Sequence, residues 1–302
     1  MTNDNTKKIK LQVAEQNIKI HHRRMVKVIK QGDRFADVTY TEKKSKSQIK
    51  KLSKTEYLVL KTGEIKKYKE GQEKRQDSLR DTFGRLRQLI RTNFTQESYS
   101  QLSITLTYAE NMQDEKRLLK DFELFYKRLK YAMKGHKLEY IVVAEPQERG
   151  AWHMHLMLKS DQPHLYIDNR DITSLWGHGF TETKRLKSDD VGAYYVAYFT
   201  DLTTEAKGVT PDEQSKARQK GARLKYYPKH FKFYRYSRGM KKPEKSDKPY
   251  EEVQKEFGEP KSVVTYELIE TDEDGKESVI NTIQKEFYKK PERGVEHGKG
   301  KQ

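Results

Sequence analysis

The chain has 302 residues, of which 33% are hydrophobic and 35% are charged, and it contains no cysteine, which excludes disulfides, cysteine-ligated zinc and thiol catalysis. Lysine and arginine number 62 against 45 acidic residues, and this net charge of +17, spread along the chain, indicates a polyanionic partner. No segment approaches the roughly 18 apolar residues of a membrane-spanning helix, and no apolar leader follows the first methionine. We therefore expect a cytoplasmic nucleic-acid-binding protein with no membrane contact.

Residues 1–76 form a basic N-terminal region that is rich in lysine. Its strand-like segments are KIKLQV (8–13), FADVTY (35–40) and TEYLVLKTGEIKKYK (55–69). The last segment predicts a hairpin that turns at Thr62 and Gly63. The basic run 41–54 predicts a loop or a surface helix. This region is a candidate accessory DNA-binding element, although it contains no clear helix-turn-helix pattern.

The middle of the chain alternates helical and strand patterns. The predicted elements are a helix over 77–94 with Asp77 or Ser78 as N-cap, a strand over 101–108, a helix over 114–133, strands over 138–145 and 151–159, and a helix over 188–202. The short connection PQERG between the two adjacent strands suits antiparallel pairing. This order predicts an α+β domain over 77–240, with a central antiparallel sheet flanked by helices.

Aromatic and cationic residues alternate in LKYYPKHFKFYRYSRG (224–239). The cations would bind phosphates and the rings would stack on unpaired bases, or the stretch is an edge strand with a cationic surface. The DNA-binding candidates here are Lys225, Tyr227, Lys232, Arg235 and Arg238. Residues 241–302 are expected to be a linker over 241–260, then a hairpin over 263–283 that turns at Asp274 and Gly275, and a tail.

Two histidines stand one residue apart in AWHMHLMLK (151–159). Because successive side chains of a strand point to opposite faces, His153 and His155 share one face and the apolar face packs on the core. Two imidazoles at this spacing can reach one cation, although two surface histidines would give the same pattern. Glu145 ends the preceding strand and would complete a site with two imidazoles and a carboxylate, which suits a divalent ion held for chemistry. Alternative third ligands are Gln147 and Glu148.

The helix predicted over 188–202 carries two tyrosines on one face. Tyr194 and Tyr198 are four residues apart and therefore adjacent on the helix surface. A phenol, with a pKa of about 10, is a poor nucleophile at neutral pH, but a metal that polarises a phosphodiester would let it attack. Taken alone, a tyrosine pair is more typical of a half-buried helix. The combination with the histidine pair is far more specific than either half.

These residues together resemble the HUH endonucleases, specifically the replication initiators of rolling-circle plasmids, phages and integrative elements of Gram-positive bacteria. The resemblance covers roughly residues 78–240, and its three motifs are SITLTY (103–108), AEPQERGAWHMHLML (144–158) and YYVAYFTD (194–201). It implies an HUH-like fold, Mg²⁺ or Mn²⁺ bound by the paired histidines and the glutamate, and nucleophilic tyrosines. Many relatives have lysines beside the second tyrosine, where this chain has Ala197 and Asp201. Cations that could replace them at the phosphate are Arg149, Lys184, Arg185 and Lys187.

The resemblance implies a site-specific nick in single-stranded origin DNA, with a 5′-phosphotyrosine at Tyr194, a free 3′-OH that primes synthesis, and a second transfer at Tyr198. Because the chain has no GxxxxGK[ST] phosphate loop, a host helicase and a DNA polymerase are expected partners. The alternatives are a relaxase or single-strand transposase of the same nuclease class, or a non-enzymatic basic DNA-binding regulator. Relaxases of this class place the tyrosine before the histidines, so the order here favours an initiator.

Overall fold

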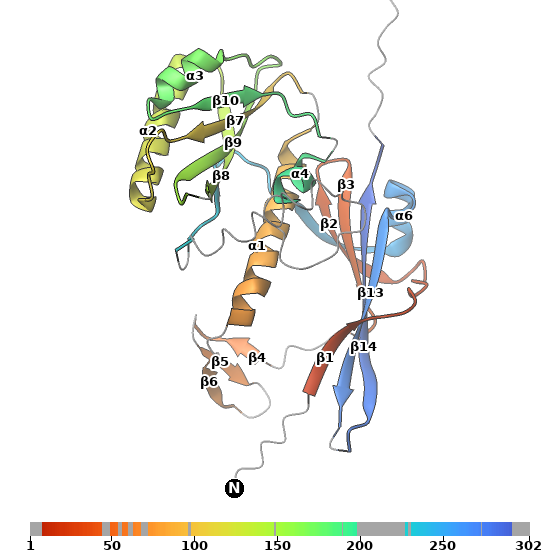
Figure 1. The fold of residues 1–302 in the computed structure, drawn as a ribbon. Helices are drawn as coiled ribbons and strands as arrows, with labels where there is room; N and C mark the ends of the chain where they lie inside the picture. Colours follow the sequence, from red (N-terminus) through yellow and green to blue (C-terminus); the bar gives the residue numbers. More distant parts are fainter. Residues whose placement is uncertain are drawn as a thin grey trace, which may run out of the picture. The chain divides into compact units, whose positions relative to one another are not determined.

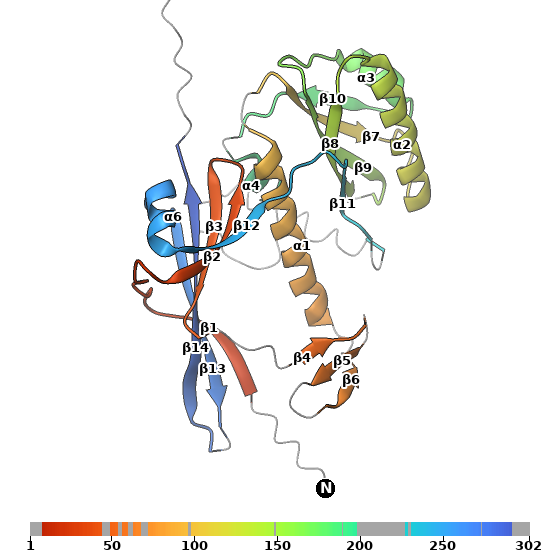
Figure 2. The ribbon, with the colours of Figure 1, turned by 180° about the vertical axis from the view of Figure 1, so that it is seen from behind.

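The chain folds into two compact units. The computed structural model describes residues 8–43, 49–53, 56–59, 63–67, 72–95, 98–147, 149–188, 190–197, 227–228, 231–272 and 274–291. The central unit comprises residues 73–242, and the terminal unit combines residues 1–72 with residues 243–302. Figures 1 and 2 show both units from opposite sides, and each unit is considered by itself below.

A five-stranded antiparallel sheet is the framework of the central unit (Figure 1). Its strands, in spatial order, are β10 (Thr181–Lys184), β7 (Gln101–Thr107), β9 (Trp152–Ser160), β8 (Leu138–Pro146) and β11 (Tyr234–Tyr236). The predicted hairpin of β8 and β9 is confirmed, and β11 adds to the free edge of β8. The two histidines therefore lie on the central strand of the sheet.

One face of this sheet packs against α2 (Glu115–Ala132) and α3 (Asn169–Trp176). The N-cap of α2 is Asp114, whose side chain accepts hydrogen bonds from the backbone of Lys116 and Arg117. The apolar stripe of α2 is buried, as its 3.6-residue periodicity predicts. Its core partners from β9 are Trp152, Met154, Leu156 and Leu158, the apolar face of the histidine strand.

The opposite face, which carries the histidines, packs against α1 (Gln72–Asn93) and α4 (Val191–Ala197). Met157, two residues after His155, is fully buried in this second core. The histidine face is therefore not an open, solvated sheet surface. The expected α+β class, with an antiparallel sheet flanked by helices, is confirmed.

Several local boundaries differ from the sequence expectations. The helix predicted over 77–94 begins earlier, at Gln72, so neither Asp77 nor Ser78 is its N-cap. Helix α3 and strand β10 had no clear periodicity, because both are short and draw their stability from packing rather than from propensity. Of the helix predicted over 188–202, the described part is α4, and residues 198–202 lie outside the described residues.

The terminal unit contains a six-stranded antiparallel sheet built from both ends of the chain. Its strands, in spatial order, are β1 (Lys8–Val13), β13 (Ser262–Thr271), β14 (Glu277–Lys289), β3 (Phe35–Thr41), β2 (Met25–Gln31) and β12 (Glu244–Pro249). Helix α6 (Tyr250–Phe257) buries Tyr250, Val253 and Phe257 in the core on one face of this sheet. A separate small sheet contains β4 (Ile49–Lys51), β5 (Glu56–Val59) and β6 (Ile65–Lys67).

Both predicted hairpins of the terminal unit are present. Strands β5 and β6 pair with Gly63 in a left-handed conformation, and β13 pairs with β14 with Gly275 in the same region. Two other expectations differ: the basic run 41–54 contains strand β4, and the Lys/Glu/Pro-rich segment 241–260 contains β12 and α6 instead of a linker. Composition alone missed these elements because their apolar residues are few and become buried only against distant strands. No described helix is long and apolar enough to cross a membrane.

We expect the folded chain to lose stability at alkaline pH. Burial raises the pKa of Tyr108, Tyr126 and Tyr288, and the carboxylate of Asp121 adds to the shift of Tyr108. Above the ordinary tyrosine pKa of about 10 the unfolded chain loses these protons first, so the contribution is complete below pH 10 and is lost as the pH rises through the raised values. Urea unfolding at about pH 7 and about pH 10.5 should show the decrease. Tyr108→Phe should flatten it, whereas Tyr131→Phe, at a side chain that is 72% exposed, should not; equal free energies at both pH values would contradict the assignment.

Candidate metal centre and nucleic-acid interface

Strand register brings the two histidines and Glu145 to one end of the sheet. Glu145 of β8 lies directly opposite His153 of β9, and Val143 lies opposite His155. Residues that face each other across an antiparallel pair point to the same side. The three side chains therefore share the face that α1 and α4 cover farther along.

The three functional atoms form a tight triangle. Nε2 of His153 lies 3.0 Å from Nε2 of His155, and Oε2 of Glu145 lies 3.3 Å and 3.2 Å from these two nitrogens. Glu145 is 2% exposed and His153 is 8% exposed, so little water reaches the triangle. All three atoms carry lone pairs, and their convergence requires a shared positive charge, either a proton or a cation. This is the only group of three or more such ligands within the described part of the chain.

The triangle fits a divalent cation. Ligand atoms on adjacent positions of an octahedron, each about 2.1 Å from Mg²⁺, lie about 3.0 Å apart, which is close to the observed 3.0–3.3 Å. One carboxylate and two imidazoles also form a donor set that leaves positions for substrate. Nδ1 of His153 is buried and has no hydrogen-bond partner among the described residues. With Nε2 as the ligand, Nδ1 is the nitrogen that carries the proton.

The alternative third ligands are not part of this group. The side chain of Gln147 accepts a hydrogen bond from Nε of Arg149 at 3.0 Å, and Glu148 lies outside the described residues. Register places two hydroxyl residues that sequence reasoning did not select on the same face: Thr105 opposite His155 and Thr107 opposite His153. The alternation of Ser and Thr in SITLTY was the signal that could have identified them.

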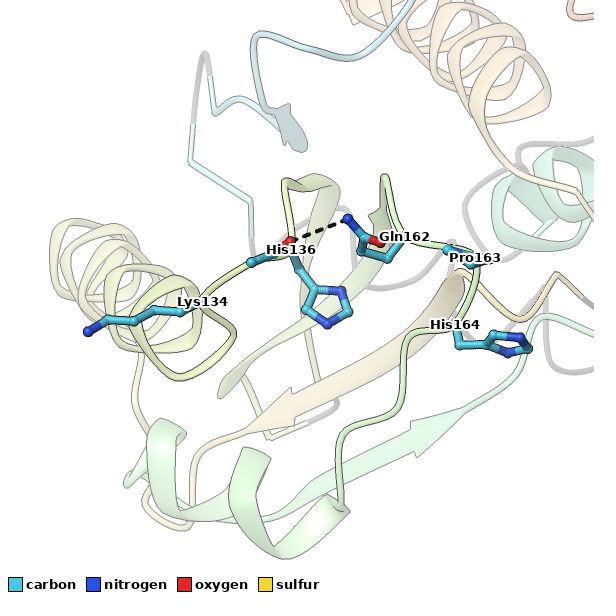
Figure 3. A pocket seen from close by; sticks show the side chains of 6 residues that line it. Lys134, His136, Gln162, Pro163 and His164 are labelled. Carbon is cyan, nitrogen blue, oxygen red and sulfur yellow. Dashed lines mark hydrogen bonds between the residues drawn. The ribbon is translucent and has the colours of Figure 1, made fainter.

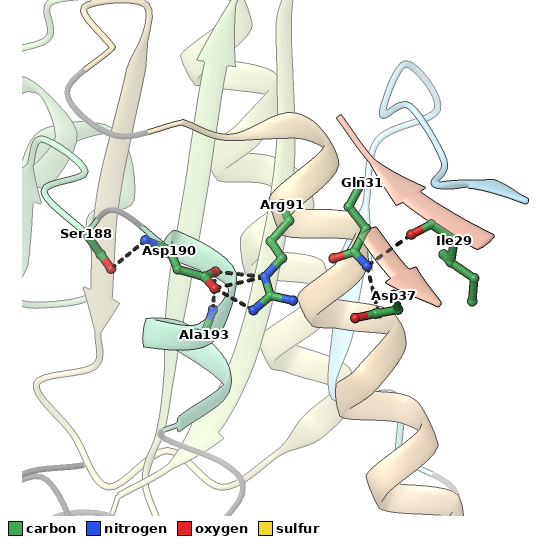
Figure 4. A network of polar contacts seen from close by, with 7 residues as sticks. All are labelled: Ile29, Gln31, Asp37, Arg91, Ser188, Asp190 and Ala193. Atoms are coloured by element: carbon green, nitrogen blue, oxygen red, sulfur yellow. Dashed lines mark hydrogen bonds and ion pairs between the residues drawn. The ribbon is translucent and has the colours of Figure 1, made fainter. Parts of the chain in front are cut away.

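Helix α4 begins at a buried ion pair with α1 (Figure 4). Oδ1 of Asp190 accepts hydrogen bonds from Nε of Arg91 at 2.9 Å and from the backbone N–H of Ala193 at 2.9 Å. The pair therefore joins the first turn of α4 to α1 and satisfies one of the free N–H groups of that turn. A Cβ at Gly192 would lie 2.7 Å from the carbonyl oxygen of Arg87, so only glycine permits this approach. Tyr194 lies in α4, and Tyr198 lies outside the described residues.

Arg149 lies at the same end of the sheet as the triangle. Its Nη2 donates to the carbonyl oxygen of Tyr108 at 3.0 Å, immediately after Thr107, which faces His153. The residue is exposed. It can therefore present positive charge beside the three ligands while one edge of its guanidinium holds the end of β7.

Two other predicted cations lie away from that end. Lys184 faces Ser103 on β7 and pairs with Glu182 at 2.7 Å. Arg185 donates to three backbone carbonyls, those of Tyr99, Gln101 and Leu165. The guanidinium of Arg185 thereby ties together the segments around the start of β7, and a purely structural role accounts for its contacts.

The aromatic and basic stretch splits between core and surface. Tyr227 is buried and donates its hydroxyl to the carbonyl oxygen of Ala144, so its ring belongs to the core and is not open to a base. Arg235 and Arg238 are exposed, but Arg235 alternates with Tyr234 and Tyr236 and so points to the face opposite the histidines. Lys232 is exposed, and Lys225 lies outside the described residues.

A surface hollow of about 440 Å³ opens at the other end of the sheet (Figure 3). It lies between the segments before β8 and after β9, where His136 bonds Ser160 and Gln162 donates to the carbonyl oxygen of Gly135. Its lining contains no carboxylate and no cluster of metal ligands. The three-ligand end, not this hollow, is the candidate site.

Comparison with known proteins points to DNA replication. Residues 101–203, about a third of the chain, match a family model described as replication-associated protein, of the ORF2 type. The matched segment runs from β7 through α4 and therefore contains Glu145, both histidines and both tyrosines. This match supports a replication initiator. No curated protein and no solved structure matches the chain significantly.

Proposed function

We propose that this protein is a rolling-circle replication initiator that nicks single-stranded origin DNA by metal-assisted tyrosine transesterification. The observation that carries the proposal is the convergence of His153, His155 and Glu145 within the segment that matches a replication-associated family. The net charge of +17 suits a polyanionic substrate. Host helicase and DNA polymerase would be partners in the cytoplasm, since the chain has no phosphate loop of its own.

The chain's residues would divide the chemistry between two elements. His153, His155 and Glu145 would hold Mg²⁺ or Mn²⁺, which when bound would polarise the scissile phosphate and stabilise its developing charge. The phenol of Tyr194 would form the new bond to phosphorus while the bond from phosphorus to the 3′ oxygen breaks. The phenolic proton leaves and the 3′ oxygen gains one, which yields a 5′-phosphotyrosine and a 3′-OH. Tyr198 would serve a second transfer, in which the 3′-OH closes a circle.

The geometry gives the supporting residues distinct duties. Arg149 would neutralise a phosphate oxygen beside the ligands, which compensates for the missing lysines around Tyr198. Arg91 and Asp190 would hold the first turn of α4, and with it the backbone that carries Tyr194, against α1. Burial of the triangle would limit attack by water, so that the phosphoryl group passes between tyrosine and DNA.

We expect Tyr194→Phe to abolish the covalent adduct. The assay is a 3′-labelled single-stranded origin oligonucleotide with Mn²⁺, followed by denaturing electrophoresis in dodecyl sulfate. Tyr198→Phe should retain the first nick and lose the second transfer, and Tyr195→Phe, the neighbouring tyrosine, is the matched control. A Tyr194→Phe protein that forms as much adduct as wild type would overturn the assignment of the nucleophile.

The competing functions predict different results. A relaxase or single-strand transposase of the same class would also form the adduct, but the order of histidines before a tyrosine pair favours an initiator. A non-enzymatic DNA-binding regulator would bind DNA without metal-dependent cleavage. Complete absence of an adduct with every divalent metal and origin substrate would favour the regulator.

A further inference from the structure

A pair of tyrosines lies on edge strand β11, on the same sheet face as the proposed metal ligands (Figure 2). Tyr234 faces Val143 of β8, and Val143 in turn faces His155 of β9. Tyr236 faces Ile141, one step farther from the ligands. The two rings thus form a short row that leads away from the site along the outer edge of the sheet.

The two rings are already close to parallel. Their centroids lie 6.2 Å apart with an interplanar angle of 22°. Tyr236 is 41% exposed, while Tyr234 is half-buried against the core formed by α1 and α4. One ring is therefore anchored by packing and the other presents an open aromatic surface.

The distance and charge of this edge suit a nucleic-acid strand. Tyr234 is two strand spacings, about 10 Å, from His155, a gap that a short run of nucleotides can cross. Arg85 of α1 lies near enough to Tyr234 for its charge to act on that phenol, and its side chain is 71% exposed. A cation beside exposed aromatic rings is the combination that binds unpaired bases through stacking and backbone through charge.

We propose that Tyr234 and Tyr236 are a stacking platform for unpaired bases that flank the nick site. This inference rests on the proposed nuclease function, because it assigns the bases of that same substrate. Stacking needs a ring but no hydroxyl, and it requires bases that are not engaged in a duplex. The platform would help the protein to select single-stranded DNA and to set the position of the scissile phosphate.

The test is equilibrium binding of fluorescent single-stranded oligothymidylate to the full-length protein in a metal chelator, where no cleavage occurs. Tyr236→Ala should weaken binding by about 10-fold to 100-fold, since base stacking contributes that much per base. Tyr236→Phe should bind nearly as well as wild type. Tyr131→Ala, which removes a tyrosine that is 72% exposed on α2, should have no effect.

Duplex DNA provides the specificity control, because Tyr236→Ala should leave its affinity unchanged. Equal affinity of Tyr236→Ala and wild type for single strands would overturn the platform, as would equal weakening by Phe and Ala. The readout is independent of catalysis. If wild type binds through Tyr236 yet forms no adduct with metal, the nuclease proposal fails and the platform remains; if adduct forms and Tyr236→Ala binds normally, the reverse holds.

Discussion

Glu145→Gln is expected to lower the rate of origin cleavage by about 1,000-fold or more, since a bound metal contributes several kcal/mol to stabilisation of developing charge. Glu145 supplies the single negative charge among the three converging ligand atoms, and it is 2% exposed. Glutamine keeps the size of the side chain but removes that charge. The variant should therefore fold and bind DNA while losing affinity for the cation.

Calorimetric titration with Mn²⁺ checks the cause directly. Wild type should bind one ion per chain, and Glu145→Gln should bind far more weakly. The matched control is Glu139→Gln, near the other end of β8, where the carboxylate accepts a hydrogen bond from the backbone of Gly239. Wild-type Mn²⁺ affinity in the Glu145→Gln protein would exclude the proposed centre, whatever happened to cleavage.

Asp190→Ala is expected to lower the free energy of unfolding by about 3–5 kcal/mol, because loss of one partner leaves a buried charge uncompensated. The side chains of Arg91 and Asp190 are 5% and 15% exposed, and Asp190 also accepts the N–H of Ala193. The same change should release the first turn of α4 from α1. Adduct formation should then fall sharply, while Mn²⁺ binding at the β8–β9 ligands persists.

Two comparison variants separate positioning from general damage. Asp81→Ala breaks an exposed pair with Arg85 on α1, whose side chains are 74% and 71% exposed, and should change neither stability nor adduct formation. Arg91→Met combined with Asp190→Leu replaces both charges with apolar groups and should recover much of the stability. If Asp190→Ala forms adduct at the wild-type rate, the ion pair does not position α4 for the reaction.

The main features of the site could be predicted from the sequence because they depend on local rules. Alternation along β9 separates an apolar face from His153 and His155, and the short connection PQERG forces β8 and β9 to pair. Once paired, the strands place Glu145 opposite His153. The hydroxyls of Thr105 and Thr107 required the register of a third strand, β7, which is separated from β9 by a helix and another strand.

What the sequence determined by itself is the pairing of β8 with β9, the helical periodicity of α2 and the charge that favours a nucleic acid. The tertiary structure alone decided which faces are covered and which ends of the chain meet. The alternating rings and cations of 224–239 did not reveal that Tyr227 is a core residue while Tyr236 stays exposed, since a strand pattern says nothing about what packs on it. Likewise β1 pairs with β13 and β3 with β14. Contacts between segments so far apart in the chain leave no local signal, because burial is a property of both partners together.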